Sequence, residues 1–282
     1  MKKIITNAMS VDVEDYFQVS ALSSKFPQKS WGSQQLRVEI GTHKLLNLFE
    51  HHNIKGTFFA LGWIAEKCPG LIKAIIDGGH ELACHGNLHQ RVTDLNKQQF
   101  AEDLYRAKST LEQLSGAGII GYRAPSFSIN ETNLWAFDVM KELGIEYSSS
   151  TYPIKHDHYG VPDWPRGPYQ VLDGLIEIPL TTMVKFGRSF PIAGGGYFRL
   201  LPYALSRWAL RSFHEKEQRS SVFYVHPWEL DEYQPVVQDI GLKTRFRHYV
   251  NLHKVEPRLS RLLSDFNWST MKDVYLNDPT LD

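Results

Sequence analysis

The stretch SVDVEDYF at residues 10–17 decides how the fold of this chain is read. It crowds the carboxylates Asp12, Glu14 and Asp15 into four consecutive positions, at the end of a strand predicted over residues 4–13. Like charges this close repel one another, so solvent, a cation or a proton must hold them. The residues at the ends of the other predicted strands are therefore the ones to compare with these carboxylates.

Apolar runs with strand character alternate along the chain with helical patterns. Strands are predicted at residues 4–13, 56–61, 80–84, 119–123, 145–150, 175–180 and 221–225, and helices at 36–52, 69–79, 97–115, 132–144 and 203–217. This alternation is typical of βα units that build a parallel sheet or barrel. Residues 151–200 interrupt it with six prolines and a run of three glycines, and predict loops and short strands. The segment after Trp228 is interpreted as an appendage with one clear helix at 254–266.

Composition excludes several classes of protein. Lys+Arg and Asp+Glu are both 31 in a chain of 282 residues, and this balance argues against a nucleic-acid partner. No run of 18 apolar residues indicates a membrane span, and the N-terminal region has no signal-peptide pattern, so a cytoplasmic location is expected. Cys68 and Cys84 are expected to be buried thiols. The sequence leaves the oligomeric state open.

Polar side chains come after several of the predicted strands. His85 and His89 in HGNLH come directly after one strand, Arg123 after the next, and His226 after the strand at 221–225. The carboxyl ends of barrel strands form one face, so these residues are expected to converge with the carboxylates of the first strand.

Two imidazoles and one carboxylate form a three-ligand metal site with open positions. Such a set suits hydrolysis at Zn²⁺ and also suits non-haem Fe(II) oxygenases. The oxygenase version commonly has a carboxylate two residues after the first His, where this chain has Asn87, so a hydrolase is preferred. Two surface or capping histidines are the alternative for HGNLH taken alone.

The carboxylates can divide the work of such a site. One binds the cation and another acts as general base on water, with Arg123 holding the base charged. His226 is the candidate general acid. Tyr197 and Arg199, beside the glycine run, and Trp228 are expected to contact substrate, with structural roles as the alternative.

The ordered motifs SVDVED, HGNLH, GYRAPSFS, EYSSSTYP and FYVHPWE resemble those of the polysaccharide deacetylases of the NodB-homology type, also called carbohydrate esterase family 4. The segments AGGGYFRLLPYAL and RFRHYVNL are similar to the subgroup associated with exopolysaccharide and exosortase gene clusters, which carries a C-terminal extension. The resemblance implies a distorted (β/α)₇ barrel over residues 1–228, with residues 229–282 as an extension packed on it. It also implies metal-dependent removal of N-acetyl groups from a saccharide, with Zn²⁺ as the expected cation.

Carried over by residue, the resemblance makes Asp12 the base, Arg123 its tether, His226 the acid, and His85 and His89 metal ligands. The usual adjacent Asp-Asp is here Asp-Val-Glu-Asp, so the metal carboxylate is Glu14 or Asp15. Relatives with Asp-x-Asp favour Glu14.

A second departure is Ser148, which stands where many members have the Asp that orients the acidic His. Two rival functions use the same barrel. One is hydrolysis of a small cyclic amide, as in imidases and allantoinases, and the other is saccharide binding without catalysis.

Overall fold

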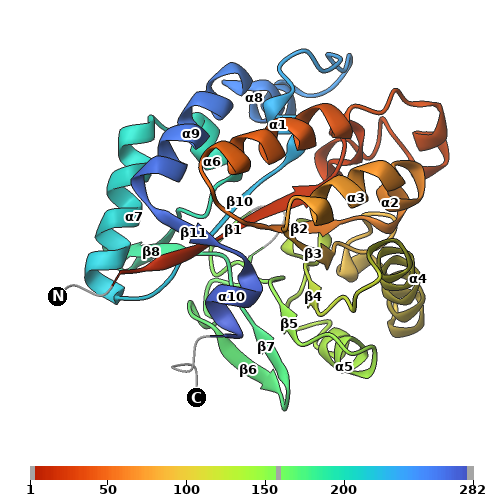
Figure 1. Cartoon of the computed structure of the whole chain (residues 1–282), viewed down its shortest axis with the longest axis horizontal. Coiled ribbons are helices and arrows are strands. Elements are labelled where there is room, and N and C mark those ends of the chain that lie inside the picture. Colours follow the sequence, from red (N-terminus) through yellow and green to blue (C-terminus); the bar gives the residue numbers. More distant parts are fainter. Residues whose placement is uncertain (1–3, 157–159, 278–282) are drawn as a thin grey trace.

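A curled, mostly parallel sheet forms the centre of the computed structural model, which describes residues 4–156 and 160–277 (Figure 1). The strands lie in the order β10-β1-β2-β3-β4-β5-β7-β6, and β11 also pairs with β1. Every pairing in this sheet is parallel except that of β6 with β7. The strands are β1 (Thr6–Val13), β2 (Thr57–Ala60), β3 (Glu81–Cys84), β4 (Gly121–Tyr122), β5 (Tyr147–Ser148), β6 (Tyr169–Leu172), β7 (Leu175–Glu177), β10 (Val222–Val225) and β11 (Asn267–Ser269).

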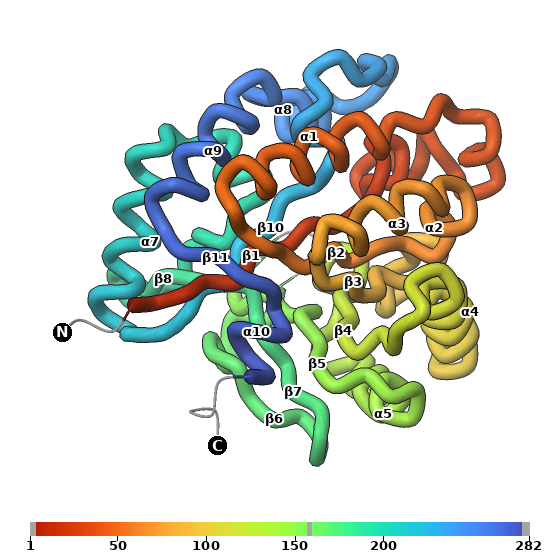
Figure 2. Tube along the Cα trace, in the orientation of Figure 1, coloured from red at the N-terminus to blue at the C-terminus, as the bar shows by residue number. Residues whose placement is uncertain are grey.

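Helices surround the outside of this sheet, as the path of the chain in Figure 2 shows for α1, α4, α5 and α7. The α-helices are α1 (Val38–His51), α2 (Gly62–Lys67), α3 (Pro69–Asp77), α4 (Lys97–Ser115), α5 (Trp135–Glu142), α6 (Gly195–Leu200), α7 (Tyr203–Glu217), α8 (Leu242–Tyr249), α9 (Val255–Asp265) and α10 (Met271–Tyr275). Short 3₁₀ helices are η1 (Tyr16–Gln18), η2 (Ser20–Leu22), η3 (Gln28–Ser33), η4 (Val92–Asp94), η5 (Pro125–Phe127), η6 (Pro227–Leu230) and η7 (Leu252–Lys254).

The two-residue period of β1 separates the outer core from the interior of the barrel. Met9, Val11 and Val13 pack in the cluster that joins the sheet to the helices. Ser10 and Asp12 lie on the opposite face of the strand, and both are buried. The alternation therefore directs polar groups of this strand into the barrel.

The helix predicted at 97–115 is confirmed with the same bounds as α4. Asn96 accepts a hydrogen bond from the backbone N–H of Gln99, and the Gln99 side chain accepts one from the Asn96 N–H in return, which makes a capping box. Gly116 ends the helix at φ 67°, a left-handed conformation that glycine adopts without a Cβ penalty.

The proline-rich region 151–200 folds into short strands and loops as predicted, except that its last residues form the helix α6 (Gly195–Leu200), which the sequence did not predict. Besides β6 and β7 the region contains β8 (Thr182–Lys185) and β9 (Arg188–Pro191), which form a separate antiparallel pair. The strand expected at 175–180 is shorter, because β7 ends at Glu177.

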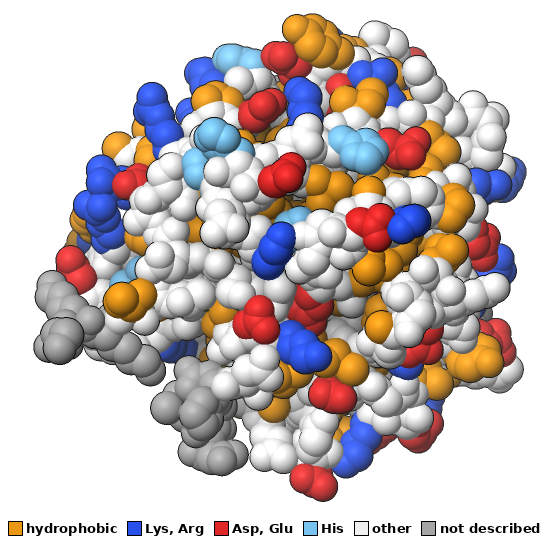
Figure 3. All heavy atoms as spheres, viewed as in Figure 1, with side chains coloured by type: hydrophobic (Ala, Val, Ile, Leu, Met, Phe, Trp, Pro, Cys, Tyr) orange, Lys and Arg blue, Asp and Glu red, His pale blue; other side chains and the backbone are white. Residues whose placement is uncertain are grey.

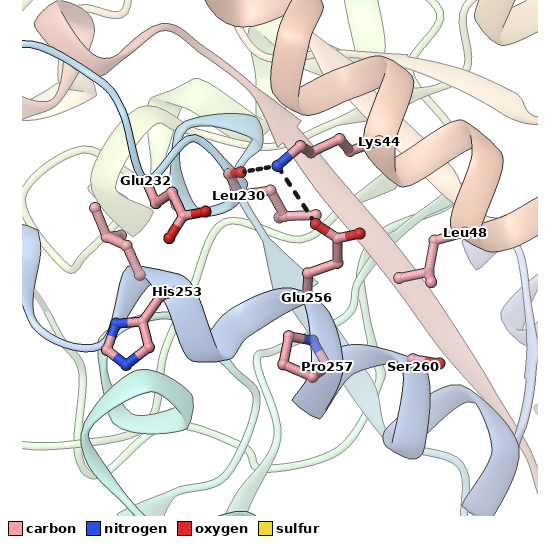
Figure 4. Close-up of a pocket in the computed structure, with 9 residues that line it drawn as sticks. Lys44, Leu48, Leu230, Glu232, His253, Glu256, Pro257 and Ser260 are labelled. Carbon is pink, nitrogen blue, oxygen red and sulfur yellow. Dashed lines mark hydrogen bonds and ion pairs between the residues drawn. The ribbon is translucent and has the colours of Figure 1, made fainter.

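The segment after Trp228 is more than the predicted appendage. Its strand β11 pairs in parallel with β1, with Ala8 opposite Ser269. Lys44 of α1 donates to the carbonyl of Leu230 and lies 3.4 Å from Glu256 of α9, beside a pocket of about 270 Å³ (Figure 4). None of the predicted site residues lines this pocket. The domain boundary at residue 228 remains a prediction.

Other expectations concern the surface and the cysteines. Positive and negative side chains are interspersed on the face seen in Figure 3. In the described part of the chain, no helix has the length and apolar character needed to cross a bilayer. Cys68 and Cys84 are both buried and unbridged, as predicted.

Candidate active site

Parallel strands bring the predicted polar residues to one end of the barrel. Asp12 lies next to the last residue of β1, His85 directly follows β3, Arg123 follows β4, and His226 follows β10. Asp12, His85 and Arg123 are buried, whereas the His226 side chain keeps 16% of its surface exposed. His226 is thus the member of this group most accessible from outside.

Glu14, His85 and His89 form a group that fits a metal ion. Their three candidate ligand atoms lie within 4.8 Å of one another. Nδ1 of His85 donates to the carbonyl of Arg123 at 2.8 Å, which leaves Nε2 of His85 with its lone pair free for a cation. The tautomer is set by the chemistry of the partner, because a carbonyl oxygen only accepts.

The contact between Glu14 and His89 further supports a cation at this place. Oε2 of Glu14 is 2.7 Å from Nε2 of His89, a distance typical of an ion pair. That approach lacks hydrogen-bond geometry, however, and Oε2 has no hydrogen-bond partner within residues 4–156 and 160–277. Burial raises the pKa of Glu14, but His89, His226 and His85 together outweigh it and lower the pKa, so Glu14 is a carboxylate.

The loop that carries the histidines is shaped by Asp103 of α4, which the sequence analysis did not single out. Its carboxylate accepts the backbone N–H groups of Asn87 at 2.8 Å and Leu88 at 3.3 Å. His89 itself has φ 50°, an uncommon conformation for a residue with a Cβ. The loop is therefore held in a conformation that turns His89 back toward Glu14.

Asp15, the other candidate for the metal carboxylate, lies outside the metal group. Its carboxylate accepts backbone N–H groups from Tyr16 at 2.8 Å, Arg37 at 2.6 Å and Val38 at 2.8 Å. It thereby caps η1 and anchors the start of α1. Among the adjacent carboxylates, the structure brings Glu14 and not Asp15 to the two histidines, which corrects the inclusion of Asp15.

Asp12 and Arg123 form a buried ion pair beside the metal group. Nη1 of Arg123 is 2.7 Å from Oδ1 of Asp12 and also donates to Oγ of Ser10 at 2.8 Å. The rest of the guanidinium donates to the carbonyl and hydroxyl of Ser149 and lies 4.1 Å from the ring centroid of Phe59. Such contacts hold the Asp12 carboxylate in one orientation and leave Oδ2 to face His226.

His226 lies across from these carboxylates. Its Nε2 is 3.6 Å from Oε1 of Glu14 and 3.9 Å from Oδ2 of Asp12. Its Nδ1 is 3.0 Å from Oε1 of Glu229. Burial lowers the pKa of His226, but Glu229, Glu14 and Asp12 outweigh it and raise the pKa to about 9. These carboxylates favour the cationic form of the ring.

The three residues that were expected to contact substrate have different surroundings in the structure. Arg199 is buried: it donates to the carbonyl of His248 at 2.5 Å, and its guanidinium carbon lies 4.8 Å from the ring of Trp228. These contacts hold Arg199 inside the protein, and its expected contact with a substrate remains a prediction. Trp228 is also buried, and its Nε1 donates to Oε1 of Glu14 at 3.1 Å. Tyr197 lines a small separate pocket with apolar neighbours, and contact of Tyr197 or Trp228 with a substrate remains a prediction.

Ser148 provides no carboxylate. The residues around it form hydrogen bonds that hold the backbone in place. Oγ of Ser148 donates to Oγ of Ser150 at 2.7 Å. Oε1 of Glu177 accepts the backbone N–H groups of Ser150 and Thr151, which fixes the chain after β5. Glu229, which the sequence analysis did not select, contacts His226 instead. The only signal in the sequence was its position three residues after that His.

Comparisons with known proteins agree with this arrangement. Residues 38–148 match the family model described as polysaccharide deacetylase, and residues 149–276 match a domain of unknown function, DUF3473. The first match includes His85, His89 and Arg123, and the second includes His226 and Glu229.

Among curated proteins, a peptidoglycan-N-acetylglucosamine deacetylase of Bacillus cereus is 33% identical over 96 residues, which are 34% of this chain and 35% of that protein. A peptidoglycan deacetylase of Helicobacter pylori is 29% identical over 113 residues, 40% of this chain and 37% of that protein. The chain thus spans about a third of the length of these two relatives.

Solved structures share the fold. A Mycobacterium smegmatis protein assigned to the polysaccharide deacetylases has a TM-score of 0.61 at 20% identity, covering 98% of this chain and 91% of that one. A family 4 carbohydrate esterase from Streptomyces lividans, in complex with acetate, has a TM-score of 0.51 at 14% identity, with 94% and 91% covered. A family 4 pseudoenzyme from Bacillus anthracis has a TM-score of 0.52 at 10% identity, with 97% and 66% covered.

The curled sheet and these neighbours define the chain as an α/β protein with the distorted barrel of the family 4 carbohydrate esterases, which confirms the predicted fold class. Residues 38–148 match the polysaccharide deacetylase family model, the family whose motifs this sequence resembles.

Proposed function

We propose that this protein is a metal-dependent hydrolase that removes N-acetyl groups from a saccharide. The observation that carries the proposal is the placement of the Asp12–Arg123 pair and of His226 around the Glu14–His85–His89 group. A base, an acid and a three-ligand cation site are what hydrolysis of an unactivated amide requires. The relatives named as peptidoglycan deacetylases support the same chemistry.

Each residue of the chain has a distinct task in this reaction. Asp12 accepts a proton from water as its oxygen adds to the acetyl carbon. Arg123 keeps Asp12 ionised and oriented through the 2.7 Å contact. Nε2 of His226 gives a proton to the nitrogen as the C–N bond breaks, so that acetate and an amine leave. Glu14, His85 and His89 would hold a divalent cation, which would supply Lewis-acid activation of the water and of the acyl carbonyl.

Zn²⁺ is our proposed cation, since two imidazoles and one carboxylate are a familiar ligand set for it. A polysaccharide made for export is the proposed substrate class, which rests on the subgroup that the C-terminal motifs resemble. A cytoplasmic location is part of the same proposal.

Acetate release from N-acetylated chito-oligosaccharides and from isolated bacterial exopolysaccharide tests this function. Cyclic ureides and imides belong in the same panel, because an imidase-like barrel would use the same residues. We expect turnover with an N-acetylated saccharide that the His85→Ala variant lacks. Turnover confined to cyclic amides, or metal binding without any turnover, would refute the deacetylase proposal in favour of one of the two rivals.

A further inference from the structure

We propose that Glu229 is the positioning residue for His226, and that the segment after β10 thereby provides the carboxylate missing at Ser148. This inference rests on the proposed function in one respect, namely that His226 acts as the proton donor. The hydrogen bond itself can be tested without any activity. Glu229 is not predicted to touch substrate or the reacting atoms.

The geometry assigns the two nitrogens of His226 to different partners. Nδ1 is 3.0 Å from Oε1 of Glu229, and Nε2 points to Asp12 and Glu14. An ionised carboxylate only accepts, so Nδ1 carries the hydrogen in this bond. The other nitrogen is then the one that presents a proton to the site, since the partner of one ring nitrogen sets the role of the other.

Glu229 is buried, so its carboxylate depends on the partners that it contacts inside the protein. Its side chain has no exposed surface, and a buried carboxylate is costly without partners. In the described part of the chain, His226 is the side chain that hydrogen-bonds to it. Nε of Arg199 lies 3.4 Å from the same Oε1, an ion-pair distance without hydrogen-bond geometry. Arg199 therefore neutralises Glu229 while His226 takes the directional bond.

Stacking restrains the ring from a second direction. Trp228 stacks with His226 at a ring-centroid distance of 5.2 Å and an interplanar angle of 24°, and His248 also stacks with Trp228, at 4.5 Å and 10°. The stack restrains the plane of the His226 ring, but a half-turn flip about Cβ–Cγ keeps that plane and exchanges Nδ1 with Cδ2. The bond from Nδ1 to Glu229 selects one of these two orientations.

The first test compares Glu229→Gln with Glu232→Gln, a control at an exposed Glu of the same segment. Glutamine has nearly the shape of Glu but offers either an oxygen or an NH₂ group, so it does not select one state of the ring. We expect kcat for an N-acetylated saccharide to fall about 10–100-fold in Glu229→Gln, the range seen when a partner that orients a functional His is removed. KM, metal content and hydrolysis of an activated aryl acetate should change less than about 3-fold.

The double variant His226→Ala/Glu229→Gln decides whether the loss runs through His226. A positioning residue has nothing left to position once the imidazole is gone, so the double variant should match His226→Ala within about 2-fold. Multiplied losses, or equal losses on amide and aryl ester, would mean that Glu229 supports the fold and not the acid.

Nitrogen-15 NMR of the wild-type protein tests the bond without turnover. The His226 signals are assigned by their loss in His226→Ala. We expect Nδ1 to be protonated, with its proton shifted downfield as in a charge-assisted hydrogen bond. A bare Nδ1 would overturn the inference. A protonated, bonded Nδ1 in a protein that deacetylates nothing would instead leave Glu229 in place and remove the proposed function.

Discussion

Nη1 of Arg123 lies 2.7 Å from Oδ1 of Asp12, and both side chains are almost fully buried. The pair joins the end of β1 to the residue after β4, so it holds two strands of the barrel together as well as orienting the candidate base. Structure and chemistry therefore depend on the same contact, and each can be tested by a different substitution.

Asp12→Asn should keep the fold and the metal and lose the reaction. Asparagine preserves the shape and can still accept a hydrogen bond from Arg123, but it cannot take a proton from water. A fall in kcat of about 10²–10⁴-fold is expected for loss of a general base. Metal content after dialysis and kcat on the amide substrate measure the two effects, with the exposed Asp94→Asn as the matched control. An active Asp12→Asn protein would exclude Asp12 as the base.

Arg123→Met should lower stability strongly. It leaves the Asp12 carboxylate buried without its partner, and breaking a buried pair in this way costs about 3–5 kcal/mol. Urea unfolding gives the free energy of unfolding. Arg123→Met/Asp12→Asn should recover part of the loss, because the stranded charge is then absent. A loss below about 1 kcal/mol would show that the buried pair contributes little to folding.

The metal group can be tested by binding alone. His85→Ala, His89→Ala and Glu14→Gln should each lose Zn²⁺ on dialysis, whereas Asp15→Asn should retain it. In the wild type, Zn²⁺ at about 100 times its Kd should stabilise the fold by about 2.7 kcal/mol, seen as a rise in Tm that the three ligand variants lack. The exposed His51→Ala is the control for loss of an imidazole. Retention of the metal by Glu14→Gln and its loss by Asp15→Asn would reverse the assignment.

His226→Ala should separate substrates by their leaving groups. An amine must be protonated as it departs, so amide hydrolysis should fall by about 10²–10⁴-fold. An aryl acetate releases a phenolate without that proton, and its rate should fall far less. A melting curve shows whether the fold is intact. Parallel loss on both substrates at unchanged Tm would remove His226 from the role of acid.

His80 lies outside the candidate active site. We expect it to make the stability of the folded protein depend on pH. The ring of His80 packs against Phe49 and Phe58, and its Nδ1 accepts the backbone N–H of Gly56 at 3.2 Å, a bond that needs the neutral ring. Burial lowers the pKa of His80 to about 4, below the usual 6.5. The unfolded chain then binds the proton first, so stability is full above pH 6.5 and is lost as the pH falls toward 4.

The His80→Gln variant removes this titration and keeps an acceptor for Gly56. Up to about 2–3 kcal/mol of the pH-dependent part of the wild-type stability should disappear with it. Urea unfolding at several pH values between about 4 and 7 gives the difference between the two proteins. A difference that stays constant across this range would contradict the assignment.

Local sequence patterns predicted the structure correctly where residues close together in the chain contact one another. Asn96 and Gln99 cap each other across three residues, so the start of α4 is predictable. The period of β1 directs Asp12 into the barrel, and the carboxyl ends of parallel strands share one edge, so the convergence of Asp12, His85 and Arg123 is predictable too. Since these contacts depend on short-range geometry and strand order, they and the barrel could be predicted from the residues alone.

The choice between neighbouring residues of the same chemistry depends on long-range packing and could not be predicted. Glu14 and Asp15 are adjacent carboxylates, and Asp15 is diverted because the backbone of Arg37 and Val38 reaches it from 22 and 23 positions further along the chain. Arg199 turns inward to Glu229 for a similar reason. Such contacts depend on how distant segments pack and on which buried charges find partners, which no local period encodes.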